Sequence, residues 1–265
     1  MKKKIFNALI LCNQRLAENV WRMVLKYPED RIEARPGQFV NVYINSKDML
    51  LPRPISICRQ EGVSLTLVYG IVGKGTRELS SYRPGTLIRA STPLGNGYDL
   101  NEMEAGSCHK PSSALMIGGG IGVPPLLELG NALIGRGLKV DAVFGFREEP
   151  FLTDAFSKLG VLVHVATDNG SEGFHGDVIK LIERKNLTAD YYFACGPKPM
   201  LKAISAHCAS KGKEIQVSIE ERMGCGYGAC VGCTCKIKAS EEATARKKVC
   251  KDGPVFRGRE VVWDE

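Results

Sequence analysis

The chain has 265 residues, and its 44% hydrophobic and 25% charged residues exclude a disordered or fibrous protein. The length predicts about two domains with a short appendage, and no stretch reaches the roughly 18–20 unbroken apolar residues that a membrane-spanning helix needs. Lysine and arginine outnumber aspartate and glutamate by 36 to 29, but this net charge of +7 is spread along the chain, which argues against nucleic-acid binding.

The N-terminal residues have a weak likeness to a secretion signal, because the basic residues 2–4 precede an apolar run over residues 5–12. The run is short and no small-x-small cleavage site follows it, so the preferred interpretation is a first β-strand. We therefore expect an intracellular, cytoplasmic protein. Cysteines in that compartment stay reduced, and clustered ones bind metals more often than they form disulfides.

Residues 1–100 contain several short β-rich runs that are separated by turns. The turn signals are Pro36-Gly37, Glu61-Gly62 and Pro84-Gly85. The runs predict strands over residues 5–12, 39–44, 54–59, 64–69 and 86–90. Many short strands with frequent turns indicate a small antiparallel β-barrel.

A polar linker over residues 101–111 precedes a change of pattern, and residues 101–219 form the second predicted domain. Short apolar strands alternate with helices there. The predicted strands are 114–118, 140–146, 162–167, 191–195 and 214–219, and the predicted helices are 124–136, 151–159, 177–184 and 199–211. Such alternation indicates a doubly wound parallel sheet that is covered on both faces.

Residues 220–265 form the third predicted unit, in which glycine and cysteine replace the periodic pattern. Cys225, Cys230 and Cys233 are separated by four and two residues, and Cys250 follows after sixteen more. This is the spacing of plant-type [2Fe–2S] ferredoxins, in which a loop wraps one side of the cluster and a distant cysteine closes the other. Glycines between the cysteines allow backbone N–H groups to approach the sulfurs.

A zinc site is the alternative for these cysteines. Zinc usually takes two spaced pairs, which would require Cys235 to join Cys250. We expect Cys235 to pack on a strand over residues 234–239, with substitution as a ligand as its other possible role. The remaining five cysteines are expected to be buried small hydrophobic residues: Cys12, Cys58, Cys108, Cys195 and Cys208.

A glycine-rich loop lies between a predicted strand and a predicted helix of the second domain. It contains four glycines: Gly118, Gly119, Gly120 and Gly122. Glycines there allow a phosphate to approach the backbone N–H groups at the start of the helix. The alternative is a tight strand-to-helix turn, because the loop does not satisfy G-x-G-x-x-G. Cys195-Gly196-Pro197 ends another strand, so we expect both loops at the sheet edge where such folds bind nucleotides, with Cys195 either near a nicotinamide or packed at its strand end.

Two segments of the first domain could together form a flavin-binding surface. Arg53-Pro54-Ile55-Ser56 supplies a cation, a rigid turn and a hydroxyl. Gly73-Lys74-Gly75-Thr76 leads into a short helix whose backbone donors could hold phosphate. Taken separately, both segments are typical of ordinary barrel turns.

The order of these motifs covers nearly the whole chain and resembles the ferredoxin–NADP reductase superfamily. Within it, the chain is similar to the electron-transfer subunits of NAD-dependent dihydroorotate dehydrogenases. The most specific matches are residues 220–233 and 249–256, and Pro93-Leu94-Gly95-Asn96-Gly97-Tyr98 also fits.

This resemblance implies FAD on the barrel, a nicotinamide site on the second domain and a [2Fe–2S] cluster on Cys225, Cys230, Cys233 and Cys250. It also implies a partner subunit that carries FMN and oxidises dihydroorotate to orotate in pyrimidine synthesis, in a heterotetramer with two of each subunit. Electrons would pass from the partner through the cluster and FAD to NAD+, with no catalytic residue on this chain. The implied FAD contacts are Arg53, Pro54, Ile55, Ser56, Val68, Tyr69, Gly70, Gly75 and Thr76.

Two departures from the family pattern stand out. Gly70 occupies a position where related chains tend to carry arginine, which puts one flavin contact in doubt. The gap before Cys250 is slightly long, which suggests a longer hairpin. The basic residues that flank Cys250 suggest either a solvated hairpin or a docking face for the partner: Arg246, Lys247, Lys248 and Lys251.

The acidic residues Glu148 and Glu149 and the loop around Asp168 favour NAD over NADP, since a 2′-phosphate would need clustered cations. The nearest alternative function is a flavin and iron–sulfur subunit of a sulfide dehydrogenase or of an NADH-dependent ferredoxin:NADP oxidoreductase. A different class of alternative is a zinc-binding regulator that keeps the fold without redox function.

Overall fold

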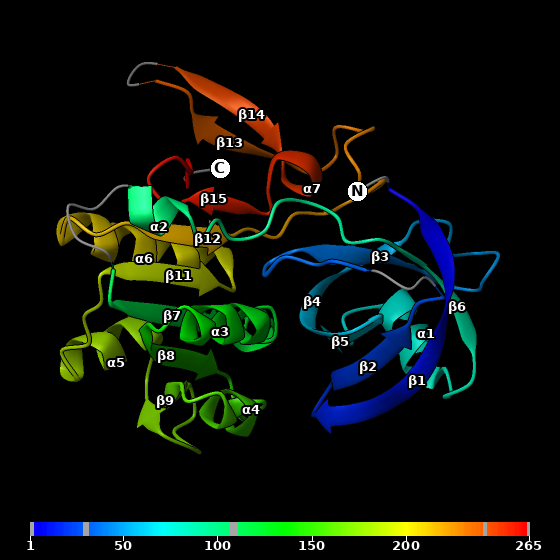
Figure 1. Ribbon diagram of the computed structural model, residues 1–265, viewed down its shortest axis with the longest axis horizontal. Coiled ribbons are helices and arrows are strands. Elements are labelled where there is room, and N and C mark those ends of the chain that lie inside the picture. Colours follow the sequence, from blue (N-terminus) through cyan, green and yellow to red (C-terminus); the bar gives the residue numbers. More distant parts are fainter. Residues whose placement is uncertain (1–2, 29–31, 106–110, 241–242, 264–265) are drawn as a thin grey trace.

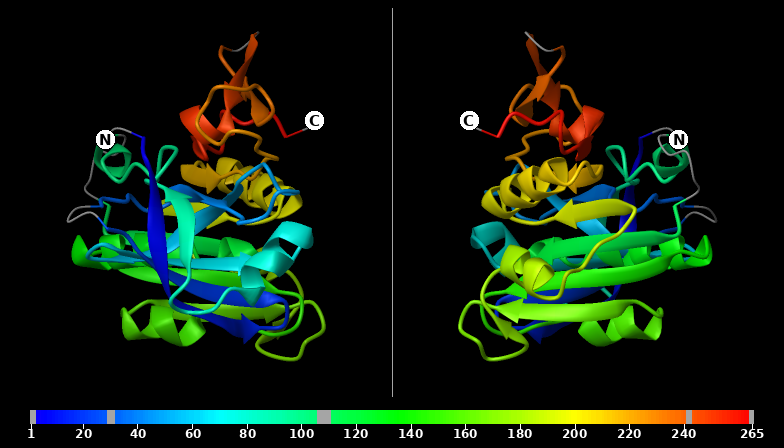
Figure 2. Two further views of the ribbon diagram at one scale, coloured as in Figure 1. Left: turned by 90° about the vertical axis from the view of Figure 1, so that its right-hand side faces the viewer. Right: turned by 90° about the vertical axis from the view of Figure 1, so that its left-hand side faces the viewer.

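The computed structural model describes residues 3–28, 32–105, 111–240 and 243–263, so Cys108 lies outside the described residues. A β-barrel and a helix-covered sheet lie next to each other, and the C-terminal tail lies across the same end of both (Figures 1 and 2). Among the described residues, no helix combines the length and the apolar character needed to cross a bilayer.

The N-terminal third of the chain closes into a barrel of antiparallel strands, as predicted. The strand order is β1-β2-β5-β4-β3-β6, and the side chains that alternate inward, such as Ile10, Leu25 and Val40, form its core. The sequence did not predict β2, and β1 extends five residues beyond the predicted strand. The elements are β1 (Ile5–Ala17), β2 (Val20–Lys26), β3 (Phe39–Tyr43), β4 (Arg53–Glu61), β5 (Ser64–Gly70), α1 (Lys74–Ser81) and β6 (Leu87–Ser91).

The middle part of the chain builds the predicted parallel sheet with helices on both faces. Its order is β10-β9-β8-β7-β11-β12-β15, with α3 and α4 packed on one face and α5 and α6 on the other. The strands are β7 (Ser113–Gly119), β8 (Lys139–Phe146), β9 (Leu162–Thr167), β10 (Phe174–His175), β11 (Tyr191–Cys195) and β12 (Ile215–Ser218). The helices are α2 (Glu102–Ala105), α3 (Leu126–Gly135), α4 (Thr153–Lys158), α5 (Val178–Arg184) and α6 (Lys198–Ser210), and the 3₁₀ turn η1 (Gly120–Gly122) precedes α3.

The tail forms a hairpin and then returns to the sheet. The strands β13 (Thr234–Lys238) and β14 (Thr244–Lys248) pair antiparallel, and α7 (Val249–Asp252) follows. Next, β15 (Val255–Arg257) pairs antiparallel with β12 and becomes the edge strand of the large sheet. The cysteine loop, from Cys225 to Cys233, and α7 lie between β12 and β15 in the chain. Because both of these strands belong to the large sheet, the sheet holds this segment at both ends. The predicted domain boundaries at residues 100 and 219 stay predictions.

The segment from Pro93 to Tyr98 joins the barrel, the sheet and the tail. The Asn96 backbone N–H donates to the Gly253 carbonyl at 2.6 Å, and its side-chain amide donates to the carbonyls of Lys251 and Asp252. The Tyr98 hydroxyl donates to the Ala194 carbonyl in β11 at 3.0 Å. These bonds hold the tail against the barrel directly after Cys250.

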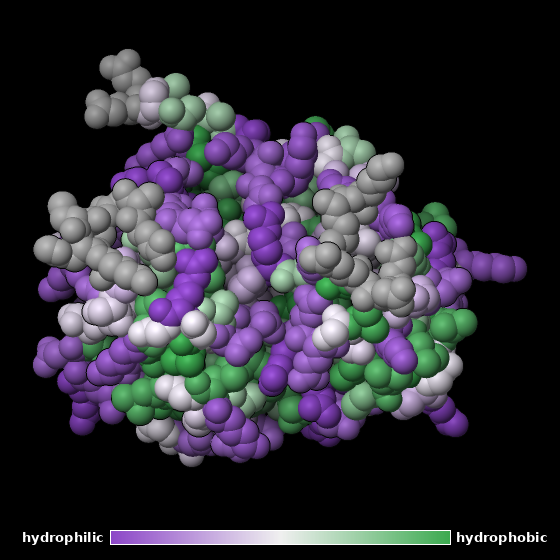
Figure 3. All heavy atoms as spheres, viewed as in Figure 1, coloured by the Kyte–Doolittle hydropathy of each residue, from purple (hydrophilic) through white to green (hydrophobic). Residues whose placement is uncertain are grey.

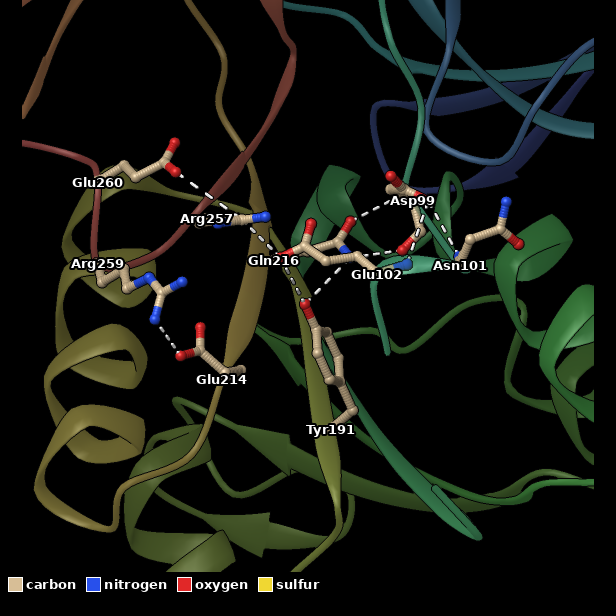
Figure 4. A network of polar contacts seen from close by, with 9 residues as sticks. All are labelled: Asp99, Asn101, Glu102, Tyr191, Glu214, Gln216, Arg257, Arg259 and Glu260. Carbon is tan, nitrogen blue, oxygen red and sulfur yellow. Dashed lines mark hydrogen bonds and ion pairs between the residues drawn. The ribbon is translucent and has the colours of Figure 1, made fainter. Parts of the chain in front are cut away.

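A polar network ties β15 to the linker and to the sheet (Figure 4). The Arg257 guanidinium contacts the Glu102 carboxylate at 2.6 Å. Tyr191 donates to the same carboxylate at 3.5 Å, and the Gln216 amide donates to the Tyr191 hydroxyl at 3.2 Å. Gln216 also exchanges hydrogen bonds with the backbone of Asp99. Because Glu102 is only 20% exposed, its charge depends on Arg257 for compensation.

We expect Arg257→Met to lower the free energy of unfolding by about 1–3 kcal/mol, since Glu102 would lose its cation. Burial raises the pKa of Glu102 and Arg257 opposes that rise. Without the guanidinium, the carboxyl would stay protonated to higher pH, so the deficit should shrink as the pH falls below neutral. Urea unfolding at several pH values measures this. Arg259→Met is the control, because its partner Glu214 is 44% exposed; an equal loss in both variants would contradict the prediction.

Candidate functional site

The four predicted cluster ligands lie together at the base of the tail, and they approach one another in two pairs. The thiols of Cys225 and Cys230 are in hydrogen-bonding contact within the cysteine loop. The thiols of Cys233 and Cys250 are in contact beneath them, and both of these residues are fully buried. The Val249 N–H donates to the Cys233 carbonyl at 2.8 Å, so α7 starts beside the third cysteine and carries the fourth.

The loop backbone favours an anionic sulfur. Burial disfavours the Cys225 thiolate, but N–H groups of Cys230, Tyr227 and Ala229 point at its sulfur and together lower its pKa to about 6. The Cys230 N–H lies 3.4 Å from the Cys225 Sγ. For Cys250, burial and the neighbouring Cys233 raise the thiol pKa. A positively charged iron would offset that cost, since metals bind the deprotonated sulfur.

The pairing fits a [2Fe–2S] cluster, in which each of the two irons takes two cysteine sulfurs. Cys235 is 7% exposed, and it packs with Ile237 and Val261 in the apolar core below the hairpin. Burial raises its pKa to about 11, as expected for a packed thiol.

The basic residues around Cys250 divide into two groups. The Lys248 ammonium donates to the Gly228 carbonyl at 2.7 Å, and the Lys251 side chain packs on Gly228, so both brace the cysteine loop. Arg246 and Lys247 are exposed on β14. Hydrophilic residues gather over the tail near the hairpin on the face shown in Figure 3.

The two predicted flavin motifs of the barrel are in contact. The Arg53 guanidinium lies directly against Gly75 at the start of α1, where a Cβ atom would collide with it. Arg53 donates to the Leu51 carbonyl at 2.8 Å, and the N-cap residue of α1, Gly73, has no side chain to cap the helix. The Thr76 hydroxyl accepts from the Val72 N–H. A guanidinium beside uncapped helix donors suits a pyrophosphate, so the residues present fit this part of FAD.

A cavity of 210 Å³ opens where the barrel, the sheet and the tail meet. Pro54 and Ser56 line it from β4, whereas Ile55, which alternates with them, points into the barrel core. The other lining residues are Phe39 from β3, Ser218 at the end of β12, Ile219, Glu220, Glu221 and Met223 from the segment after β12, and Pro254 from the tail. The flavin ring would fit here between the cysteine loop and the sheet.

The structure does not bring the third predicted flavin segment to this cavity. Tyr69 is 3% exposed, and its hydroxyl donates to Asn13 at 3.0 Å. Val68 is also buried, and Gly70 pairs with Val20 across the β2–β5 ladder. A contact of Val68, Tyr69 or Gly70 with FAD stays a prediction.

The two predicted nucleotide loops pack on each other at the carboxyl ends of β7 and β11. Cys195 is paired with Gly118 in the parallel ladder. A Cβ atom on Gly122 would overlap the Cys195 carbonyl, and one on Gly119 would lie 2.8 Å from Pro197. Gly120 has a φ of +52° and faces open space. Glycine is thus required at Gly119 and Gly122 for loop packing, and Gly120 leaves room for a ligand.

A cleft of 610 Å³ extends along these loops. Gly119, Gly120 and Gly196 line it, together with Glu148, Glu149 and the barrel turn from Ala17 to Val20. Glu220 is the residue that this cleft shares with the cavity beside Pro54. The Glu220 side chain is exposed along the cleft, and the protein around its carboxyl disfavours the ionised form and raises its pKa. Cys195 is buried, and burial raises its pKa to about 12, so it remains a neutral thiol.

Sequence comparison identifies the protein class. The model of the iron–sulfur cluster binding domain of dihydroorotate dehydrogenase B matches residues 220–262. A dihydroorotate dehydrogenase B (NAD(+)) electron transfer subunit from Bacillus caldolyticus is 44% identical over 261 residues, covering 96% of this chain and 97% of that relative. The chain belongs to this family of electron transfer subunits. Another member, from Shouchella clausii (strain KSM-K16), is 39% identical and covers 99% of this chain.

Membership of the dihydroorotate dehydrogenase B electron transfer subunits confirms the resemblance and the oxidoreductase assignment made from the sequence. Solved structures agree on the fold. The structure of an NADH-dependent reduced ferredoxin-NADP oxidoreductase superimposes with a TM-score of 0.84 at 29% identity, over 97% of this chain and 90% of that one. A flavohemoglobin from Malassezia yamatoensis superimposes with a TM-score of 0.67 at 20% identity, over 80% of this chain and 58% of that one, which supports the fold.

Sequence reasoning missed three residues that the structure brings to the site. Glu220 and Met223 line the cavities described above, and the Asn41 amide contacts the cysteine loop. Asn41 had a detectable signal, because it is a polar residue within the otherwise apolar strand F-V-N-V-Y. Glu220 directly follows the last predicted strand of the second domain, residues 214–219. It therefore lies at the carboxyl edge of the sheet, where such folds bind ligands.

Proposed function

We propose that this chain carries electrons from a partner subunit, in which dihydroorotate is oxidised to orotate at FMN, through a [2Fe–2S] cluster and FAD to NAD+. The observation that carries the proposal is the cavity at the junction of barrel, sheet and tail. One side of it leads through Glu220 into the nucleotide cleft, and another side is Met223, two residues before Cys225. A flavin in this cavity would lie between the cluster and the nicotinamide.

The residues of the chain place these groups and exclude unwanted chemistry. Bound FAD would supply the link between single-electron exchange with the cluster and hydride transfer to the nicotinamide. Arg53 and the start of α1 would hold the flavin pyrophosphate, and Gly119 and Gly120 would admit the dinucleotide phosphates. Cys195 stays protonated and buried beside the loops, so it provides packing and no nucleophile.

The partner would dock over the cysteine loop in a heterotetramer of two subunits of each kind. Tyr227 is 48% exposed and Val231 is 72% exposed, so this side of the loop offers apolar contacts next to the cluster ligands. Arg246 and Lys247 on the neighbouring strand β14 would add charge complementarity at its rim.

The assay is dihydroorotate-dependent reduction of NAD+ by this chain alone, by the FMN-containing partner alone, and by the two purified together. We expect activity only from the complex, and a mass by sedimentation that matches two copies of each subunit. Activity from this chain alone would contradict the division of labour. Co-purification of the native chain with a glutamate-synthase-like flavoprotein would replace the proposed partner.

Glu220→Gln tests the junction between the two cavities. The nicotinamide ring is cationic in NAD+ and neutral in NADH, so a carboxylate beside it favours NAD+ selectively. We expect the variant to bind NAD+ about fivefold more weakly, equivalent to about 1 kcal/mol, with NADH affinity unchanged. Isothermal titration with each nucleotide measures both constants.

The same change predicts a pH dependence. Because the pKa of Glu220 is raised, its carboxyl becomes neutral at a higher pH than an ordinary glutamate. The NAD+ affinity of the native protein should therefore fall toward that of Glu220→Gln as the pH drops through this pKa, while the variant stays flat. Glu221→Gln is the matched control, because Glu221 lines only the flavin cavity. An equal effect at both positions would remove the specific role of Glu220.

A second candidate is the corresponding subunit of an NADH-dependent ferredoxin:NADP oxidoreductase, which the superposition at a TM-score of 0.84 favours. Both functions would use the same cavities, so the partner and its substrate decide between them. Glu148 and Glu149 line the nucleotide cleft and would repel a 2′-phosphate, which supports NAD as the nucleotide in either case.

A further inference from the structure

Asn41 occupies an unusual place in the barrel wall. It is fully buried in the middle of β3, and its neighbours Val40 and Val42 point into the barrel core. Asn41 therefore points outward, on the same side of the strand as Phe39, which lines the flavin cavity. In the ladder with β4, Asn41 is opposite Pro54 of the flavin motif. This outward face lies between the flavin cavity and the tail.

Within the part of the chain that the structure describes, the side chain of Asn41 makes one hydrogen bond, and that bond goes to the cysteine loop. Its Nδ2 donates to the carbonyl of Cys225 at 2.9 Å. Among the described residues, its Oδ1 is buried and has no donor. The opposite orientation of the amide would bring two oxygen atoms together, so the direction of the bond is fixed. Burying an acceptor without a donor is costly, whereas an apolar residue at this position would avoid that cost.

The loop is shaped to receive this amide. Gly226 has a φ of +75°, which favours glycine, and a Cβ atom there would lie 2.5 Å from both Nδ2 and Oδ1 of Asn41. The backbone N–H of Asn41 donates to Ser91 at 2.9 Å, which holds β3 in place. A second bond from the N-terminal part of the barrel, from the Lys3 ammonium to the Tyr227 carbonyl at 3.1 Å, is exposed to solvent.

We propose that Asn41 is a positioning residue for the iron–sulfur cluster, and this rests on the proposed function of the cysteine loop. Its amide fixes the peptide between Cys225 and Gly226 on the outer wall of the barrel. The N–H groups that follow in the loop then point at the Cys225 sulfur. Asn41 thereby sets how firmly the cluster is held and where it lies relative to the flavin cavity.

The test compares Asn41→Leu and Asn41→Asp with the native protein, each purified anaerobically in complex with its partner. Asparagine and aspartate have the same shape, but a buried carboxyl tends to stay protonated and could still donate to the Cys225 carbonyl. Asn41→Asp is therefore measured at a pH high enough to ionise the carboxyl, where it cannot donate, and it then decides the matter if Asn41→Leu does not fold. We expect both variants to lose cluster iron to a chelator about tenfold faster. The reduced cluster should show altered EPR g-values and a more negative midpoint potential, with the FAD content unchanged.

Ser91→Ala is the matched control, because it removes the other buried hydrogen bond of Asn41 and leaves the contact with Cys225. It should retain the native chelation rate and EPR spectrum. Native cluster behaviour in both Asn41 variants would overturn the proposal, as would equal cluster loss in Ser91→Ala. If the native protein itself showed no reducible [2Fe–2S] signal, the proposed function would fail, and this outcome is distinct from the other two.

Discussion

Replacing Cys250 with alanine is expected to remove the [2Fe–2S] cluster and leave FAD in place. Cys250 is fully buried, and its thiol contacts that of Cys233, so alanine would leave a buried gap in the ligand set beside Cys233. We expect cluster affinity to fall by about 100-fold or more. Dihydroorotate-dependent NAD+ reduction by the complex should be lost, whereas NADH oxidation by a dye that accepts electrons from the flavin should persist.

Cys235→Ala provides the control for this prediction. Cys235 is a buried thiol only two residues after Cys233, but it packs in the apolar core below the hairpin. Its replacement should cost some stability and keep the visible absorption and the EPR signal of the cluster. Retention of the cluster in Cys250→Ala together with its loss in Cys235→Ala would make Cys235 the fourth ligand and leave Cys250 as a packing residue.

The elements that were predictable from the sequence are those whose signal is local. The strands of the parallel sheet are short apolar runs, and the helices between them carry their own apolar faces, so both could be located by pattern. The strand β2 was missed because Val20 and Val24 are apolar on the outward side of the strand and obscure the polar–apolar alternation that identifies a half-buried strand. Its identity comes from pairing with β1 and β5.

The edge strand β15 could not be predicted from the sequence for a different reason. Its three residues follow Pro254 and carry no periodicity, and it becomes a strand because Val217 and Phe256 pair across from each other. Likewise, the spacing of the cysteines predicted a cluster. Spacing could not show that Asn41, 184 residues earlier, donates to the Cys225 carbonyl. Contacts of this kind depend on which surfaces the folded parts bring together, and a local pattern does not contain that information.

Gly122→Ala is expected to have the largest effect on nucleotide binding. The methyl group would overlap the backbone of Cys195 and Gly196, which is held in the sheet by the ladder between β11 and β7 and cannot move aside as a flexible side chain could. One of the two nucleotide loops must therefore shift away from the other. We expect the free energy of unfolding to fall by about 1–3 kcal/mol and NADH affinity to fall by about 10–100-fold.

We expect Gly122→Ala to weaken nucleotide binding without changing the binding of the other two cofactors. In the proposed function FAD and the cluster would be held by the barrel wall and the tail, so flavin and iron contents of Gly122→Ala should match the native protein while NADH titration fails to saturate. Gly135→Ala is the matched control at the far end of the helix that follows this loop, because a Cβ atom there meets no neighbour. It should leave NADH binding unchanged and raise stability by about 0.5–1 kcal/mol through the better helix propensity of alanine. Native NADH affinity in Gly122→Ala would show that the two loops can separate freely, and the close packing of Gly122 on Cys195 would then have no part in forming the nucleotide cleft.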